Sequence, residues 1–306
     1  MKTNIKNTFG KASLTLLKLA SHSFAQVFIF ALSSFLFISC DQQEIESFDS
    51  QKDTPLAISS AGVADLSTRA IADGKLVGTA DENATMSIFI TGGSEAKYNA
   101  TNVKWEHDGT GWDSETSVLY EGTNSSQKIC ALSPYVENAS ADGVTIEADG
   151  VTDYLIATTK LVRSNTVSLN MQHALTKLVL VPTLGTEVAD DEIVKVEVQN
   201  MYASGTLNIE ENWWSNQGEA TATLAMTNNE VLVIPMEECE SFPIVITMNS
   251  GRVFKATISL DNVESELAGG TQYTITLQVG QDTVAIGGIT ADSWGTPISG
   301  GNLETE

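Results

Sequence analysis

Short runs in which apolar and polar residues alternate recur along most of this chain. In TVSLNM (166–171), Val167, Leu169 and Met171 alternate with polar residues without interruption. A period of two places successive side chains on opposite faces and predicts a half-buried β-strand. No long window has helical spacing, and only a turn of helix fits near 189–192. The pattern therefore predicts an all-β fold.

The runs fall into two consecutive sets, and each run is rich in β-branched or aromatic residues and bounded by turn-forming residues. The first set comprises 84–90, 102–105, 127–132, 143–148, 154–162 and 166–171. The second comprises 174–183, 192–201, 205–210, 220–226, 230–236, 243–248, 252–260, 272–279 and 283–289. Many short strands at such spacing are typical of β-sandwiches. We predict two tandem β-sandwich domains, 70–172 and 173–306.

The amino-terminal end has the pattern of an export signal. Four lysines and no acidic residue precede an apolar run, 27–38, that ends shortly before Cys40. The run is shorter than the roughly 20 residues that a membrane-spanning helix needs, so we expect a signal peptide over 1–39. Ser39 before Cys40 resembles a lipobox, which predicts acylation of Cys40 and a lipid anchor. An ordinary secretory signal with a chance cysteine is the alternative.

A polar segment, 40–69, separates the signal from the first strand set. Its first part is mostly Gln, Glu, Ser, Asp and Lys, and it cannot bury a core alone. The following LAISSAGVADLSTRA could supply one strand and ends in Arg69 and Ala70. An arginine in an exposed extended segment is a good site for a trypsin-like protease. We expect a propeptide or stalk over 40–69, with cleavage between Arg69 and Ala70.

The chain is strongly acidic, with a formal charge of -23, and all 39 acidic residues follow the signal. Such a surface repels nucleic acid and anionic headgroups, so no nucleic-acid partner is expected. After the signal the chain has two histidines, His107 and His173, and neither has a second His or a Cys at metal-ligand spacing. We expect His173, between two strands, to pack or to hydrogen-bond.

The motifs of common catalytic centres are missing from the sequence. It has no G-x-S-x-G elbow, no phosphate-binding Gly loop and no activated Cys–His pair. We therefore predict a protein that is not an enzyme, with no catalytic residue, no metal and no cofactor. Cys130 and Cys239 lie in or beside apolar runs, where a buried free thiol is common. A disulfide between them is the alternative in an exported protein.

Exposed tryptophans are the sequence feature that could indicate sugar binding. Trp213 and Trp214 follow the predicted strand 205–210. Adjacent residues of a strand face opposite sides, so we expect one exposed Trp of the pair. Trp213 or Trp214 is therefore a candidate glycan contact.

Several segments occur together in a characteristic order. A lipoprotein signal, an arginine site and a strand-rich domain ending in DYLIATTKLV come first. They are followed by TVSLNMQHALTKLVLVPT, GTLNIEENWW, PIVITMNSGRVFKATI, GGTQYTITLQV and a late Trp in ITADSW. Together they resemble the fimbrillin-like proteins, the type V pilus subunits and related surface lipoproteins of Bacteroides-type bacteria. The most specific pieces are HALTKL (173–178) and GGTQYTITL (269–277).

The resemblance implies two transthyretin-like or immunoglobulin-like sandwiches and assembly by donor-strand exchange. The precursor would reach the outer membrane as a lipoprotein, and a protease would cut after an arginine, matched here by Arg69. The strand upstream of the cut would leave a groove, into which another fimbrial subunit inserts a strand. Other subunits and, for the precursor, the outer membrane are the implied partners; the surface receptor is left open.

The carboxyl-terminal tail departs from the pattern of a stalk subunit. GTPISGGNLETE after Trp294 is Gly-rich, polar and short, whereas a donor strand alternates apolar and polar residues. A tip or accessory subunit would accept a strand without donating one. We therefore expect a structural subunit of cell-surface fimbriae that supports adhesion. The alternatives are a permanently anchored surface lipoprotein that binds glycans and, third, a hydrolase.

Overall fold

The computed structural model describes residues 49–63, 84–263 and 265–294. Cys40, Arg69 and Ala70 lie outside these ranges. The strands of the first half are β1 Ala57–Val63, β2 Thr85–Thr91, β3 Ala100–His107, β4 Trp112–Asp113, β5 Lys128–Ser133, β6 Val144–Glu147, β7 Leu155–Leu161 and β8 Thr166–His173. Those of the second half are β9 Thr176–Leu184, β10 Ile193–Tyr202, β11 Ser204–Asn208, β12 Trp213–Ser215, β13 Ala220–Ala225, β14 Glu230–Val233, β15 Ser241–Met248, β16 Val253–Ser259, β17 Thr271–Val279 and β18 Val284–Ser293.

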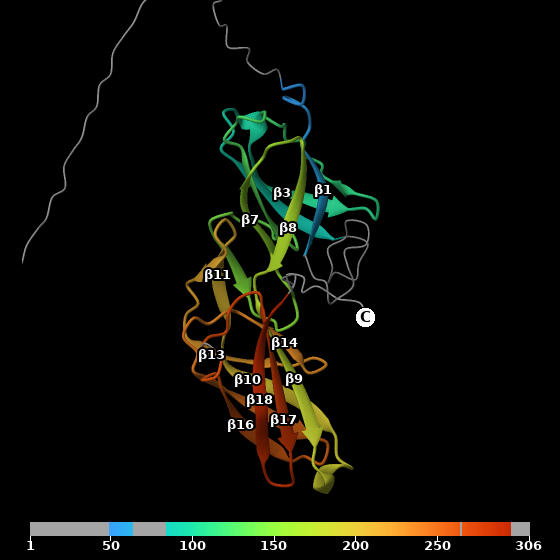
Figure 1. Ribbon diagram of the computed structural model, residues 1–306, viewed down its shortest axis with the longest axis vertical. Helices are drawn as coiled ribbons and strands as arrows, with labels where there is room; N and C mark the ends of the chain where they lie inside the picture. The colour runs from blue at the N-terminus through green and yellow to red at the C-terminus, as the bar shows by residue number, and fades with distance from the viewer. Residues whose placement is uncertain (1–48, 64–83, 264, 295–306) are drawn as a thin grey trace, which may run out of the picture. The chain divides into compact units, whose positions relative to one another are not determined.

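The first half forms a seven-stranded sheet with the order β1-β8-β7-β5-β2-β3-β4. Figure 1 labels β1, β3, β7 and β8 of this sheet. Strand β1 pairs in parallel with β8, and the other neighbours are antiparallel. One apolar cluster contains Ile58 of β1 and Trp112 of β4, which are the two ends of the sheet order. The sheet therefore curls around a single core.

The second half is a sandwich of two four-stranded sheets. Their orders are β13-β10-β15-β16 and β14-β9-β17-β18. The core between them takes Val198 and Ile246 from the first sheet and Leu178 and Ile275 from the second. Apolar side chains from facing sheets fill such a core in every β-sandwich. The predicted all-β fold is confirmed.

A small third sheet, β12-β11-β6, joins strands from the two halves of the chain. Gly205 of β11 pairs with Ile146 of β6, and Leu207 pairs with Trp214 of β12 on the other side. A third apolar cluster lies here and includes Leu175 from the link between β8 and β9. Both strands of the β6–β11 pair were predicted, but their pairing was not.

Helical structure in the described residues is limited to two short 3₁₀ helices, Ala96–Tyr98 and Thr186–Val188. The second precedes the turn predicted at 189–192, and the first was not predicted. Strands β4 and β12 were also missed because two or three residues are too few to show a period. In this part of the chain no helix has the length and apolar character to cross a membrane.

Candidate functional site

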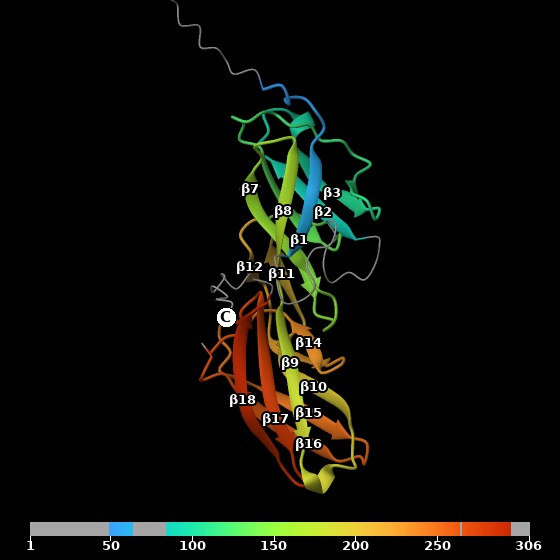
Figure 2. The same cartoon turned by 45° about the vertical axis from the view of Figure 1, so that its right-hand side comes forward.

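Strand β1 lies between two segments that are distant from it in the sequence. On one side it runs parallel to β8, with Ile58 opposite Val167 and Val63 opposite Met171. Figures 1 and 2 show β1, in blue, alongside β8. On the other side, Leu56 N–H donates to the carbonyl oxygen of Val118 at 2.8 Å. The segment therefore links one edge of the sheet to the chain that follows β4.

The side chains of 56–59 alternate between the core and solvent, and residues 61–63 are all buried. Leu56, Ile58, Ala61 and Val63 are each at most 5% exposed, whereas Ala57 and Ser59 face outward. Burial of a large aliphatic side chain is worth about 1.5–3 kcal/mol. The strand thus supplies part of the first core, although it comes from the segment predicted as a propeptide.

A polar contact anchors the chain just before β1. The Asp53 carboxylate accepts hydrogen bonds from Lys97 Nζ at 2.8 Å and from the Tyr98 hydroxyl at 2.7 Å. These two donors, Lys97 first, hold the pKa of Asp53 below its ordinary value. Nothing in the sequence pattern indicated this contact, because its partners are more than forty residues apart.

One residue of the tryptophan pair is exposed and the other is buried, as their adjacent positions on a strand predict. Trp213 is 50% exposed, whereas Trp214 is 9% exposed and donates its indole N–H to the carbonyl oxygen of Ala174 at 3.2 Å. Trp213 borders a hollow of about 210 Å³ that is also lined by Gln217 and Glu237. Of the two candidate glycan contacts, Trp213 is the one that is exposed to solvent.

His173 packs as expected. It is buried, its Nδ1 lies 2.8 Å from Asp153 Oδ2, and its ring stacks on that of Trp294 with centroids 3.5 Å apart. His107 is also buried and meets the ring of Trp112 edge-on. The structure therefore gives both histidines packing partners and does not bring them together.

Cys130 and Cys239 are free and buried. Burial raises the pKa of the Cys130 thiol to about 12 and also raises that of Cys239. No group of three or more His, Cys, Asp or Glu side chains within the described ranges is arranged to hold a metal ion. The two thiols are core residues in this fold.

The comparisons with known proteins bear on most of the described region. A family model described as fimbrillin-like matches residues 68–294, which is more than half of the chain. The chain belongs to the fimbrillin-like family. This is a family of cell-surface fimbrial proteins, as the segments HALTKL and GGTQYTITL indicated.

Solved structures of low sequence identity share the fold. A candidate cell adhesion protein from Bacteroides uniformis is 16% identical, with a TM-score of 0.59, over 79% of this chain and 98% of that one. A second, from Bacteroides ovatus, is 14% identical, with a TM-score of 0.62, over 79% of this chain and 98% of that one. None of the curated proteins compared with the chain matches it.

Proposed function

We propose that this fimbrillin-like protein is a tip or accessory subunit of cell-surface fimbriae that supports adhesion. In this proposal Cys40 carries the lipid that holds the precursor at the outer membrane. Cleavage between Arg69 and Ala70 separates the propeptide, 40–69, from the two sandwiches, 70–172 and 173–306. A strand of another subunit then takes the place of β1.

The position of β1 carries the proposal. Strand β1 ends at Val63 and β2 begins at Thr85, so Arg69 lies in the one connection between them. A cut there leaves β1 without a covalent link to the sheet in which it pairs. The strand is parallel to β8 and at one end of the sheet order, so it can leave without breaking any other strand pair.

The energetics favour exchange over simple loss of the strand. Three large side chains of this segment, Leu56, Ile58 and Val63, are buried in the first core. At about 1.5–3 kcal/mol each, they contribute roughly 5–9 kcal/mol, so β1 stays bound after a cut until another strand replaces it. The vacated edge of β8 would otherwise present unpaired backbone groups and apolar pockets, which invite aggregation.

The pairing of β18 supports a tip or accessory position. Strand β18 pairs with β17 along its whole length, from Val284 opposite Val279 to Ser293 opposite Thr271. It is thus already part of the second sandwich. In the acceptor role the subunit uses only the groove beside β8.

Replacement of Arg69 tests the activation step. We expect Arg69→Ala to leave lipidated monomer at the membrane and no polymer, because β1 stays covalently joined. Lys75→Ala, which also removes one positive charge from the same connection, is the matched control and should polymerise normally. Amino-terminal sequencing of surface protein should give Ala70 as the first residue. Polymer whose subunits still carry residues 41–69 would overturn the proposal.

A second candidate function is glycan binding at Trp213. The observation that favours it is the exposed indole beside a hollow with amide and carboxylate groups, a combination that suits sugar rings and hydroxyls. Binding on a glycan array should be lost in Trp213→Ala and kept in Val253→Ala, which removes an equally exposed apolar side chain elsewhere. Equal binding by both variants would exclude Trp213 as the contact.

A further inference from the structure

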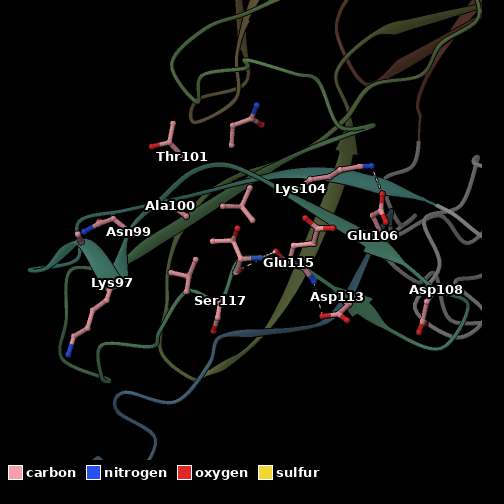
Figure 3. Close-up of a pocket in the computed structure, with 16 residues that line it drawn as sticks. Lys97, Asn99, Ala100, Thr101, Lys104, Glu106, Asp108, Asp113, Glu115 and Ser117 are labelled. Atoms are coloured by element: carbon pink, nitrogen blue, oxygen red, sulfur yellow. Dashed lines mark hydrogen bonds and ion pairs between the residues drawn. The ribbon is translucent and has the colours of Figure 1, made fainter.

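The outer edge of β3 is covered only at its two ends. Strand β4 pairs with Glu106 and His107 and with no earlier residue of β3. At the other end, Leu119 N–H donates to the carbonyl oxygen of Lys97. Between these points the segment 114–118 leaves the sheet. The result is a cleft of about 950 Å³ between residues 99–104 and 113–118, which we call the β3 cleft (Figure 3).

One wall of the β3 cleft is an open strand edge. Residues 100–104 pair with β2 on their inner side and have no strand partner on the other side within the described residues. Backbone N–H and C=O groups on such an edge form a template for another extended chain. At about 3.3 Å per residue, the exposed stretch 99–104 is roughly 20 Å long. It therefore has room for one short strand.

The charges of the β3 cleft select a basic occupant. Its lining includes four carboxylates and two lysines. Lys97 is paired with Asp53, and Lys104 with Glu106. The lining carboxylates that remain outside these ion pairs are Asp108, Asp113 and Glu115. On the facing wall, Glu115 is exposed, and the structure shows no hydrogen bond or ion pair to it from any described residue. A Lys or Arg side chain of an incoming strand could pair with it.

A bulge narrows the choice of partner further. Ile88 pairs with Val103 and Ile90 with Ala100, so β3 has one extra residue here, and Asn102 has a φ of 51°. Bulges twist an edge and disturb its ladder locally, so an added strand must follow this twist. A second copy of the edge is bulged at the same place and would also bring acidic side chains together, so it is unsuited to pair here.

We propose that the β3 cleft binds an extended basic segment of a partner protein, which adds as a strand to residues 100–104. The backbone of the partner pairs with the open edge, and its Lys or Arg side chains face Glu115 and Asp113. The open edge of β3 lies apart from the pairing of β1 with β8 in the sheet order, so the evidence for this proposal does not rest on strand exchange.

The probe is a capped peptide of alternating lysine and valine, KVKVKVK, with the acidic peptide EVEVEVE as its counterpart. Binding to the full chain in mild detergent is measured by calorimetry, and the site is located by amide hydrogen exchange. We expect the basic peptide to bind, the acidic one not to bind, and exchange to slow at residues 99–104. Absence of basic-peptide binding, or protection confined to another edge such as β18, would overturn the proposal.

Two backbone-methylated forms of the basic peptide test strand addition. One carries N-methyl groups on its lysine amides and the other on its valine amides. Because alternate N–H groups of an extended chain point to the same side, one form should bind about tenfold more weakly than the other. Equal affinity of the two forms would mean that the peptide is held by charge alone.

A charge-reversal pair tests the role of Glu115. We expect Glu115→Lys to weaken binding of the basic peptide by about five- to tenfold. Glu137→Lys is the matched control, since Glu137 is exposed in the same half of the chain and does not line the cleft. An equal loss in both variants would place the effect in the net charge of the protein and would contradict the assigned site.

Discussion

The backbone N–H of Leu56 donates a 2.8 Å hydrogen bond to the carbonyl oxygen of Val118, which joins the start of β1 to the wall of the β3 cleft. Two bonds extend this link, from Tyr120 N–H to the Thr54 oxygen and from Asp53 N–H to the Tyr120 oxygen. All three bonds come from residues just before β1, so departure of the segment 53–63 would break them. Assembly by strand exchange would therefore also loosen one wall of the cleft.

Substitution of a buried β1 residue tests this link in the uncut chain. We expect Ile58→Ala to lower the free energy of unfolding of the first half of the chain by about 2–4 kcal/mol, because it removes a core side chain. Amide exchange at Tyr120 should accelerate in this variant, since its N–H bonds to Thr54. Ala57→Ser, at an exposed site of β1, should change stability by no more than about 0.5 kcal/mol. Unchanged exchange at Tyr120 would show that β1 does not hold this wall.

The strands could be predicted from the sequence where one face of the strand is buried and the other is exposed to solvent. Strand β8 is the clearest case, since its residues alternate between exposed and buried from Thr166 to His173. The split of Trp213 and Trp214 follows from the same alternation. A period of two indicates on which face of the strand each side chain lies. These features could therefore be predicted without knowing the neighbouring strands.

The partners of the strands were not predictable, because the alternation carries no information on which strand lies alongside. The pairing of β6 with β11 and the bond between Leu56 and Val118 both join segments about sixty residues apart. The segment 56–70 was expected to supply one strand, but the bounds of that strand and its parallel place beside β8 needed the structure. The β3 cleft was missed for a related reason, since it arises where segment 114–118 leaves the sheet edge.

The adjacent tryptophans form a matched pair for a stability measurement. Trp214 is buried in the third apolar cluster and donates to Ala174, whereas Trp213 is half exposed. We expect Trp214→Ala to cost about 3–5 kcal/mol in the free energy of unfolding, measured by urea denaturation. Trp213→Ala should cost no more than about 0.5 kcal/mol. Similar losses for both would contradict the opposite orientation of the two rings.

Trp214→Phe separates the two contributions at that site. It keeps most of the ring and removes the indole donor, which leaves the carbonyl of Ala174 without this bond. The expected cost is about 1–3 kcal/mol, between those of the wild type and the alanine variant.

The turn between β3 and β4 should make stability depend on acid pH. Asp108 accepts hydrogen bonds from the Thr110 hydroxyl and from the Thr110 and Gly111 N–H groups, which lower its pKa from 3.8 to about 2. Because the pKa is lower in the folded state than in the unfolded one, this contribution is present above about pH 4 and is lost as the pH falls toward 2. Asp108→Asn should therefore have a lower Tm than the wild type at pH 7.

The difference in Tm should narrow as the pH falls from about 4 to about 2, as followed by circular dichroism. Thr110→Val, which removes one donor, should show a smaller difference with the same pH dependence. A difference that is constant across this range would mean that ionisation of Asp108 does not contribute.

Thiol counting tests both the core cysteines and the lipid anchor. Cys130 and Cys239 are buried, and burial raises the pKa of each thiol, to about 12 for Cys130. Because the thiolate is the reactive form, neither should react with iodoacetamide at pH 8 in the folded protein.

After denaturation both should react, and Cys40 should react only where it carries no lipid. The uncut Arg69→Ala chain from cells should thus show two reactive thiols by mass spectrometry. The same chain made without residues 1–39, and so without export, should show all three. Three reactive thiols in the exported chain would show that Cys40 is not acylated.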